Sequence, residues 1–152
     1  MKLNELFETT IFIPQGNLNI PRRNMPQVAE EHQKEYFEYL KDHGAEVKLT
    51  KVLAKQLKPT QKEINVKAVE DLVKSGSSKL KKPIIVSADG FVIDGHHRWL
   101  ATLNKNEEGK VNVAISKAPV RRLLVLTRDF DKSLFRDKHN QEYRDINTSL
   151  EH

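Results

Sequence analysis

Cysteine is absent from this 152-residue sequence. A chain without thiols has no disulfide framework, no thiolate metal site and no cysteine nucleophile, so several classes of enzyme are excluded. Long apolar runs are also missing, because no segment approaches the roughly 18 apolar residues of a membrane-spanning helix. The N-terminus lacks the apolar region and cleavage site of a secretory signal. We therefore expect a folded, cytoplasmic protein.

The bulk composition is that of an ordinary globular domain. Hydrophobic residues make up 38% of the chain and charged residues 31%, a balance too apolar for wholesale disorder. A domain of this length buries roughly 70% of the surface that its unfolded chain exposes, so a core is feasible without disulfides or metals. The net charge of +5 favours phosphate-bearing partners such as nucleotides or DNA, although a merely basic surface carries the same charge.

The chain divides into four stretches by composition and pattern. We expect an N-terminal arm and helix at residues 1–44, a compact domain at 45–130, a tail at 131–149 and the start of a vector-encoded histidine tag at 150–152. The helix is expected from Pro26 to His43, where apolar or ring-bearing residues recur at every fourth position. The residues of this stripe, which should pack, are Val28, His32, Tyr36 and Leu40.

Strand and helix patterns alternate within residues 45–130. Runs of period two indicate strands, apolar residues three or four apart indicate helices, and Asp-Gly between two β-prone runs indicates a hairpin. The expected elements are a strand at 45–52, a helix from the cap Asn65 to Lys74, hairpin strands at 84–86 and 91–93, a helix ending near Asn104, a strand at 110–116 and a helix after Pro119. Beyond Phe130 we expect a short helix or a loose tail. The pattern predicts an α+β fold, with a small mixed sheet and flanking helices.

The second hairpin strand passes directly into residues 94–98 (DGHHR) and then into a helix. Such a junction presents unpaired backbone N–H groups at the positive end of the helix dipole, where phosphate binds readily. Gly95 allows a sharp turn and the close approach of a ligand, and Arg98 can bind a phosphate through two parallel hydrogen bonds. The chain has neither a Walker P-loop nor a protein-kinase signature, so any phosphate chemistry is expected at this turn.

The surroundings of this turn resemble the ParB/sulfiredoxin superfamily. The shared order is a proline-containing loop at residues 57–61 (LKPTQ), a helix, two hairpin strands, the DGHHR segment and an apolar helix. The resemblance covers about residues 47–116 and not residues 1–44, and the most similar motif form is that of ParB-like nuclease domains and free serine kinases. It implies a ParB/sulfiredoxin-like fold that binds ATP or ADP through Gly95, His96, His97, Arg98 and Thr60.

The resemblance also narrows the activity. Sulfiredoxin has its catalytic cysteine where His96 stands, so a sulfinic-acid reductase is excluded, and the chain is too short for the helix-turn-helix domain and dimerisation tail of partition proteins. The serine-kinase branch uses an acidic residue near the proline-containing loop as its base. Here Glu63 is the nearest carboxylate, and Gln61 is a candidate for the acidic position. Asp94 is the other candidate, as the base or as a ligand of Mg²⁺, and His97 is a candidate catalytic residue beside it.

Two functions are therefore expected. The first is an ATP- or ADP-dependent phosphotransferase that acts on a hydroxyl of a small molecule such as serine, or of a nucleic acid. Phosphoryl transfer requires little beyond in-line positioning, charge neutralisation and a nearby carboxylate. The alternative is a ParB-like DNA-binding or DNA-cleaving module, in which Arg22 and Arg23 enter a nucleic-acid groove. An inactive adaptor that keeps the fold is a third possibility.

Simpler roles are open for several of these residues. His96 and His97 could be metal ligands, could cap the helix or could pack against Trp99. Asp94 could be an ordinary turn residue, and Glu63 could be a solvated charge. Other basic residues in expected loops or element ends, at 79–82 and at Arg121-Arg122, could reach a phosphate backbone.

Overall fold

The computed structural model describes residues 11–14, 16–75, 82–136 and 142–143, so the expected tag and most of the expected tail lie outside the described residues. The longer helices are α2 (Gln33–Asp42), α3 (Val66–Ser75), α4 (His96–Lys105) and α5 (Val120–Asp129). Short helical turns are η1 (Arg22–Asn24), η2 (Glu30–His32) and η3 (Ala54–Gln56). The strands are β1 (Val47–Leu53), β2 (Lys58–Pro59), β3 (Ile84–Val86), β4 (Phe91–Asp94), β5 (Lys110–Ser116), β6 (Phe135–Arg136) and β7 (Glu142–Tyr143).

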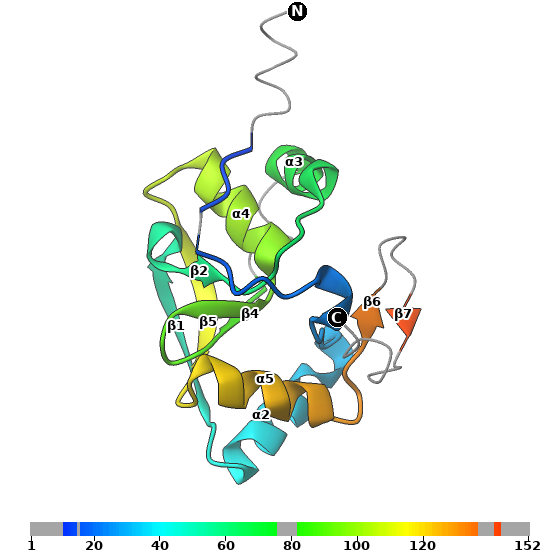
Figure 1. The fold of residues 1–152 in the computed structure, drawn as a ribbon. Helices are drawn as coiled ribbons and strands as arrows, with labels where there is room; N and C mark the ends of the chain where they lie inside the picture. Colours follow the sequence, from blue (N-terminus) through cyan, green and yellow to red (C-terminus); the bar gives the residue numbers. More distant parts are fainter. Residues whose placement is uncertain (1–10, 15, 76–81, 137–141, 144–152) are drawn as a thin grey trace, which may run out of the picture.

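Five strands form one mixed sheet in the order β1-β5-β3-β4-β2 (Figure 1). The pairs β1·β5 and β3·β4 are antiparallel, whereas β3·β5 and β2·β4 are parallel. A second, two-stranded sheet joins β6 to β7. The α+β class and the small mixed sheet are thus confirmed.

Two helices cover each face of the five-stranded sheet (Figure 1). Side chains alternate across a strand, and β3 shows it: Ile85 packs toward α2 and α5, while Ile84 and Val86 pack toward α3 and α4. The first face buries Tyr36 and Leu40 of α2 with residues of α5, and the second buries Trp99 and Leu100 of α4. The same holds for β4, the strand that leads into the DGHHR turn, because Ile93 packs on the first face and Val92 on the second.

Most expected elements of residues 45–130 are present. The hairpin, the strand at Lys110–Ser116 and the helix after Pro119 lie where the pattern predicts them. Asn65 caps α3 as expected, because its Oδ1 accepts a hydrogen bond of 3.0 Å from the backbone N–H of Ala68. The loop expected at residues 57–61 differs in one respect, since Lys58–Pro59 pairs with β4 as the short strand β2.

The N-terminal helix begins later than Pro26, where the sequence pattern places it. Gln27 pairs with Leu134 through two backbone hydrogen bonds of 2.8 Å, and Ala29 is extended, with φ −63° and ψ 150°. The N-terminal helix therefore starts only at Glu30. The segment before it is extended apart from the short turn η1, and it crosses in front of the β4–α4 junction (Figure 1).

The start of the expected C-terminal tail belongs to the fold. Phe135 is 1% exposed, and Ser133 donates a side-chain hydrogen bond to the backbone carbonyl of Thr127. Of the two expectations for this stretch, a short helix or a loose tail, the helix is absent over residues 131–136, because Leu134 forms a bridge with Gln27 and β6 follows. In the described part of the chain, none of the helices has both the length and the apolarity to cross a membrane.

Candidate functional site

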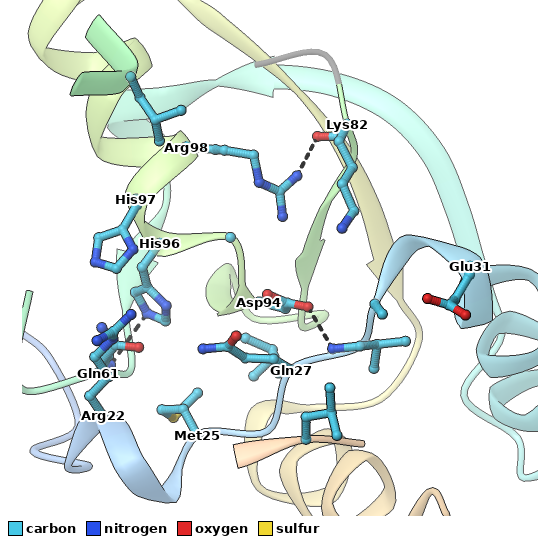
Figure 2. A pocket seen from close by; sticks show the side chains of 16 residues that line it. Arg22, Met25, Gln27, Glu31, Gln61, Lys82, Asp94, His96, His97 and Arg98 are labelled. Carbon is cyan, nitrogen blue, oxygen red and sulfur yellow. Dashed lines mark hydrogen bonds between the residues drawn. The ribbon is translucent and has the colours of Figure 1, made fainter. Parts of the chain in front are cut away.

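A pocket of about 430 Å³ opens where β4 passes into α4 (Figure 2). Its floor is the turn that carries Asp94 and Gly95, and the extended N-terminal segment forms the opposite wall. The residues that line it are Arg22, Met25, Gln27, Val28, Ala29, Glu31, Gln61, Leu72, Lys82, Ile93, Asp94, Gly95, His96, His97, Arg98 and Leu134. The pocket thus combines the DGHHR turn with segments that are distant from it in sequence.

Gly95 shapes the β4–α4 junction. It is the N-cap residue of α4 and has a φ of 110°, a left-handed conformation that favours glycine. No side-chain hydrogen bond caps this end of the helix. An added Cβ would lie 2.8 Å from Arg98 Nη2 and 3.1 Å from Ile84 Cγ1, so the site has no room for a side chain. The first intrahelical hydrogen bond runs from Trp99 N to Gly95 O. The first turn of α4 therefore lies at the positive end of the helix dipole, where anions bind readily.

The guanidinium of Arg98 is held in place by backbone carbonyls. Its Nη1 donates to Lys82 O over 2.7 Å and to Pro83 O over 3.1 Å, while Nη2 lies over Gly95. Burial lowers the pKa of Arg98, and the charges of Asp94 and Glu30 oppose that shift. The side chain thus brings a fixed positive charge to the upper rim of the pocket (Figure 2).

His96 is buried, with 4% of its surface exposed, at the first position of α4. Its Nε2 lies 3.1 Å from Thr60 N and 3.3 Å from Gln61 N, and both amides donate to it. Burial, with a smaller contribution from His97, lowers the pKa of His96 to about 3. The imidazole is therefore neutral at neutral pH and ties the proline-containing loop to the start of α4.

Asp94 places a carboxylate in the pocket opposite these donors. Its Oδ2 accepts a 3.0 Å hydrogen bond from Val28 N, so one oxygen is fixed by the N-terminal segment (Figure 2). Glu31 adds a second carboxylate, whereas Arg22, Lys82 and Arg98 add three cationic side chains. Cations therefore outnumber carboxylates among the lining residues, as an anion site requires.

The sequence singled out several residues that do line the pocket: Arg22, Asp94, Gly95, His96, His97 and Arg98. The ring of His97 is nevertheless directed toward the start of α3, where its Nε2 accepts a 3.2 Å hydrogen bond from Asn65 N. It thus connects two helix N-termini. Among the residues that the structure describes, His97 lies on the α3 side of the pocket, away from Asp94 (Figure 2).

Three of the residues singled out are absent from the described lining of the pocket. Thr60 is fully buried and donates its hydroxyl proton to Val92 O over 2.7 Å. Its backbone N–H donates to His96 Nε2, so Thr60 helps to hold the imidazole in place. Glu63, a candidate base, accepts a 3.0 Å hydrogen bond from Arg22 N on the N-terminal segment. Arg23 lies in the same short turn as Arg22 but does not face the pocket.

Sequence reasoning did not assign Gln27, Glu31 or Lys82 to the site. Gln27 and Glu31 stand on the N-terminal segment, more than sixty residues from the DGHHR turn, and nothing local marks them as neighbours. For Lys82 a signal existed, because it ends the basic run at 79–82. The side chains of this run before Lys82 lie outside the described residues.

Comparisons of this chain with known protein families, with curated proteins and with solved structures give no match. The chemistry of the pocket therefore follows from its own side chains.

Proposed function

We propose that the pocket binds the phosphates of a nucleotide, ATP or ADP, and that the protein transfers a phosphoryl group to a hydroxyl acceptor. One observation carries this proposal: an uncapped helix N-terminus, three cationic side chains and a carboxylate converge on one pocket. Helix N-termini and arginine bind phosphate oxygens, and a carboxylate beside them serves a hydroxyl acceptor.

The cationic side chains neutralise the phosphate charge in this proposal. Arg98 is prepositioned by Lys82 O and Pro83 O, so it loses little side-chain freedom when an anion binds. Lys82 and Arg22 approach from other segments. Phosphoryl transfer depends mainly on such positioning and charge neutralisation, which act on the transition state as well as on the bound nucleotide.

Asp94 is the base in this proposal. It lies within the pocket and is anchored through one oxygen, which leaves the other oxygen to accept a proton from the acceptor hydroxyl. Glu63 is the weaker candidate, because its carboxylate binds Arg22 N and does not line the pocket within the described structure. The acceptor hydroxyl should therefore approach from the side of the N-terminal segment.

Mg²⁺ fits the pocket only together with a nucleotide. The described residues contain no cluster of three or more His, Asp or Glu side chains that could hold a metal ion. Nucleotide-bound Mg²⁺ needs just one or two protein carboxylates, because phosphates and waters supply its other ligands. Glu31, which also lines the pocket, would hold the ion if Asp94 is the base, and Asp94 would hold it if it is not; in both cases the ion would neutralise phosphate charge.

We also propose that the domain is a ParB/sulfiredoxin-like fold. Two features support this assignment: DGHHR occupies the junction between a hairpin strand and a helix, and the proline-containing loop lies against that junction through His96. A shared fold does not determine the reaction, so the activity has to be tested directly.

The test is a transfer assay with radiolabelled ATP and ADP, in the presence of Mg²⁺, against free serine, other small hydroxyl compounds and an oligonucleotide. We expect label in one acceptor class with the unmodified chain and a loss of at least a hundredfold with Arg98→Ala. Arg121→Ala is the matched control, because Arg121 is an exposed arginine on α5 outside the pocket. Equal transfer by both variants, or none by the unmodified protein to any acceptor, would contradict the proposal.

A further inference from the structure

The imidazole of His96 uses one nitrogen to hold a neighbouring loop. Two backbone amides, Thr60 N at 3.1 Å and Gln61 N at 3.3 Å, point at Nε2. The Thr60 hydroxyl is also 3.2 Å from Nε2, but its proton is directed to Val92 O at 2.7 Å. Nε2 is therefore an acceptor, and it must carry a lone pair rather than a proton.

The position of the ring proton follows from these contacts. A neutral imidazole carries one proton, and when Nε2 accepts, that proton is on Nδ1. A proton on Nε2 would face the N–H groups of Thr60 and Gln61 in a buried site, with both donors left unsatisfied. The hydrogen-bond network thus assigns the tautomer that has Nδ1–H.

Nδ1 lies on the other side of the ring. Within the described part of the chain, every hydrogen-bonding contact of the His96 side chain is made by Nε2. Figure 2 shows the second ring nitrogen turned toward the pocket interior, on the side of Asp94. An N–H group that faces the pocket is a directed donor, and an oxygen of a bound ligand can accept its hydrogen bond in place of water.

We propose that His96 is a neutral donor of fixed tautomer, which binds an oxygen of the bound phosphate through Nδ1–H while Nε2 holds the loop of Thr60 and Gln61. This inference rests on the proposed phosphate site and extends it. His96 and Arg98 donate in different ways, because the imidazole adds a directed hydrogen bond and no charge. The ligand atom that His96 meets must be an acceptor, as a phosphate oxygen is and an ammonium group is not.

The same ring connects the phosphate to the N-terminal segment. Thr60 O accepts backbone hydrogen bonds of 3.3 Å from Leu18 and from Ile20. Ile20 O in turn accepts from Lys62 N. A phosphate bound at Nδ1 would therefore be connected to the N-terminal segment through His96 and the backbone hydrogen bonds of Thr60.

Two substitutions separate the two nitrogens. In His96→Gln, the side-chain amide reaches the position of Nε2 and can accept from the loop, but the donor at the Nδ1 position is lost. In His96→Asn, the shorter amide supplies a donor at the Nδ1 position and leaves the loop amides without their acceptor. His96→Gln therefore keeps the acceptor for the loop and loses the donor to the phosphate, whereas His96→Asn keeps the donor and loses the acceptor.

The experiment measures binding of inorganic tripolyphosphate by calorimetry, without any acceptor or transfer step. We expect His96→Gln to weaken binding about tenfold, the effect of one lost hydrogen bond to a charged group, and His96→Asn to stay within about threefold of the unmodified chain. Nitrogen-15 NMR of the unmodified, ligand-free protein at pH 7 should show His96 protonated at Nδ1 only. That spectrum tests the tautomer even if a variant fails to fold.

Three results would overturn the inference: a proton on Nε2 in the spectrum, a His96→Gln variant that binds tripolyphosphate as tightly as the unmodified chain, or no binding by the unmodified chain. The transfer assay tests the proposed reaction independently of these binding results. If binding depends on His96 but no acceptor is labelled, the proposed reaction fails and the inference stands. If transfer occurs and His96→Gln binds normally, the inference fails and the reaction stands.

Discussion

Asp94 Oδ2 and the backbone N–H of Val28 form a 3.0 Å hydrogen bond that joins the DGHHR turn to the N-terminal segment. The next contact along this segment is the paired bridge between Gln27 and Leu134. The candidate base is therefore also the residue that holds one wall of its own pocket. A substitution at Asp94 has to separate these two roles.

Asp94→Asn makes that separation, because its amide oxygen can still accept from Val28 N while the charge is gone. We expect phosphoryl transfer to fall by about 10²- to 10⁴-fold, the usual contribution of a general base. Binding of tripolyphosphate should remain equal or become slightly tighter, since a negative charge leaves the anion site. Transfer kinetics and calorimetry on the same variant give both quantities.

Glu63→Gln is the matched comparison for the base. Gln can keep the hydrogen bond that Glu63 accepts from Arg22 N, and the Glu63 side chain does not line the described pocket. We expect transfer within about twofold of the unmodified protein. A large loss with Glu63→Gln and none with Asp94→Asn would assign the base to Glu63 instead.

Gly95→Ala should disturb the pocket in two ways, by a steric clash with Arg98 and by backbone strain. The φ of 110° disfavours a side chain, and the added Cβ would lie 2.8 Å from Arg98 Nη2. We expect a loss of about 1–3 kcal/mol in the free energy of unfolding and at least tenfold weaker binding of tripolyphosphate, because the guanidinium must move. Denaturant unfolding and calorimetry measure these changes.

Gly44→Ala provides the control for backbone strain alone. Gly44 also has a positive φ, 78°, but no atom lies within 4 Å of the Cβ that would be added. Its cost should be about 1 kcal/mol, with tripolyphosphate binding unchanged. Normal binding by Gly95→Ala would show that the position of Arg98 does not matter for the anion.

The sequence predicts the elements of residues 45–130 because their signals are local. Alternating apolar residues give β5, Asp-Gly gives the β3–β4 hairpin, and the side chain of Asn65 gives the start of α3. The DGHHR turn is local in the same sense, since one strand, one glycine and one helix start create it. Such features depend on neighbours in the chain, which a single sequence displays.

The wall of the pocket formed by residues 27–29 could not be predicted from such local signals. The apolar spacing of Val28, Tyr36 and Leu40 indicates one helix, and all three side chains are indeed buried. Backbone pairing with Leu134 and the carboxylate of Asp94 nevertheless keep residues 27–29 extended. These partners come from distant parts of the chain, and spacing alone cannot distinguish a buried extended residue from a buried helical one.

Acid should destabilise the protein through His96. Its pKa is about 3 in the folded protein, against about 6.5 in an unfolded chain. Below about pH 6.5 the unfolded chain therefore binds a proton that the folded protein excludes. The stabilising contribution of the neutral ring is complete above pH 6.5 and decreases as the pH falls toward 3.

Urea unfolding at pH 7 and pH 5 measures this contribution. Between these values His96 should lower the free energy of unfolding by about 2 kcal/mol in the unmodified chain. His96→Gln has no such proton, so its loss over the same interval should be smaller by that amount, and carboxylates common to both proteins cancel. Equal losses in the two proteins would mean that the ring titrates normally.

Arg22 and Arg23 distinguish the nucleotide site from a DNA-binding surface. The two residues are adjacent in η1, but only Arg22 lines the described pocket. If the pocket holds nucleotide phosphates, Arg22→Ala should weaken tripolyphosphate binding several-fold and Arg23→Ala should leave it unchanged. A DNA-binding module should instead retain duplex DNA at low salt, lose it steeply as salt rises, and be weakened by both substitutions, because each arginine neutralises a backbone phosphate. Calorimetry with tripolyphosphate and a salt titration of DNA retention, performed on both variants, therefore decide between the two functions.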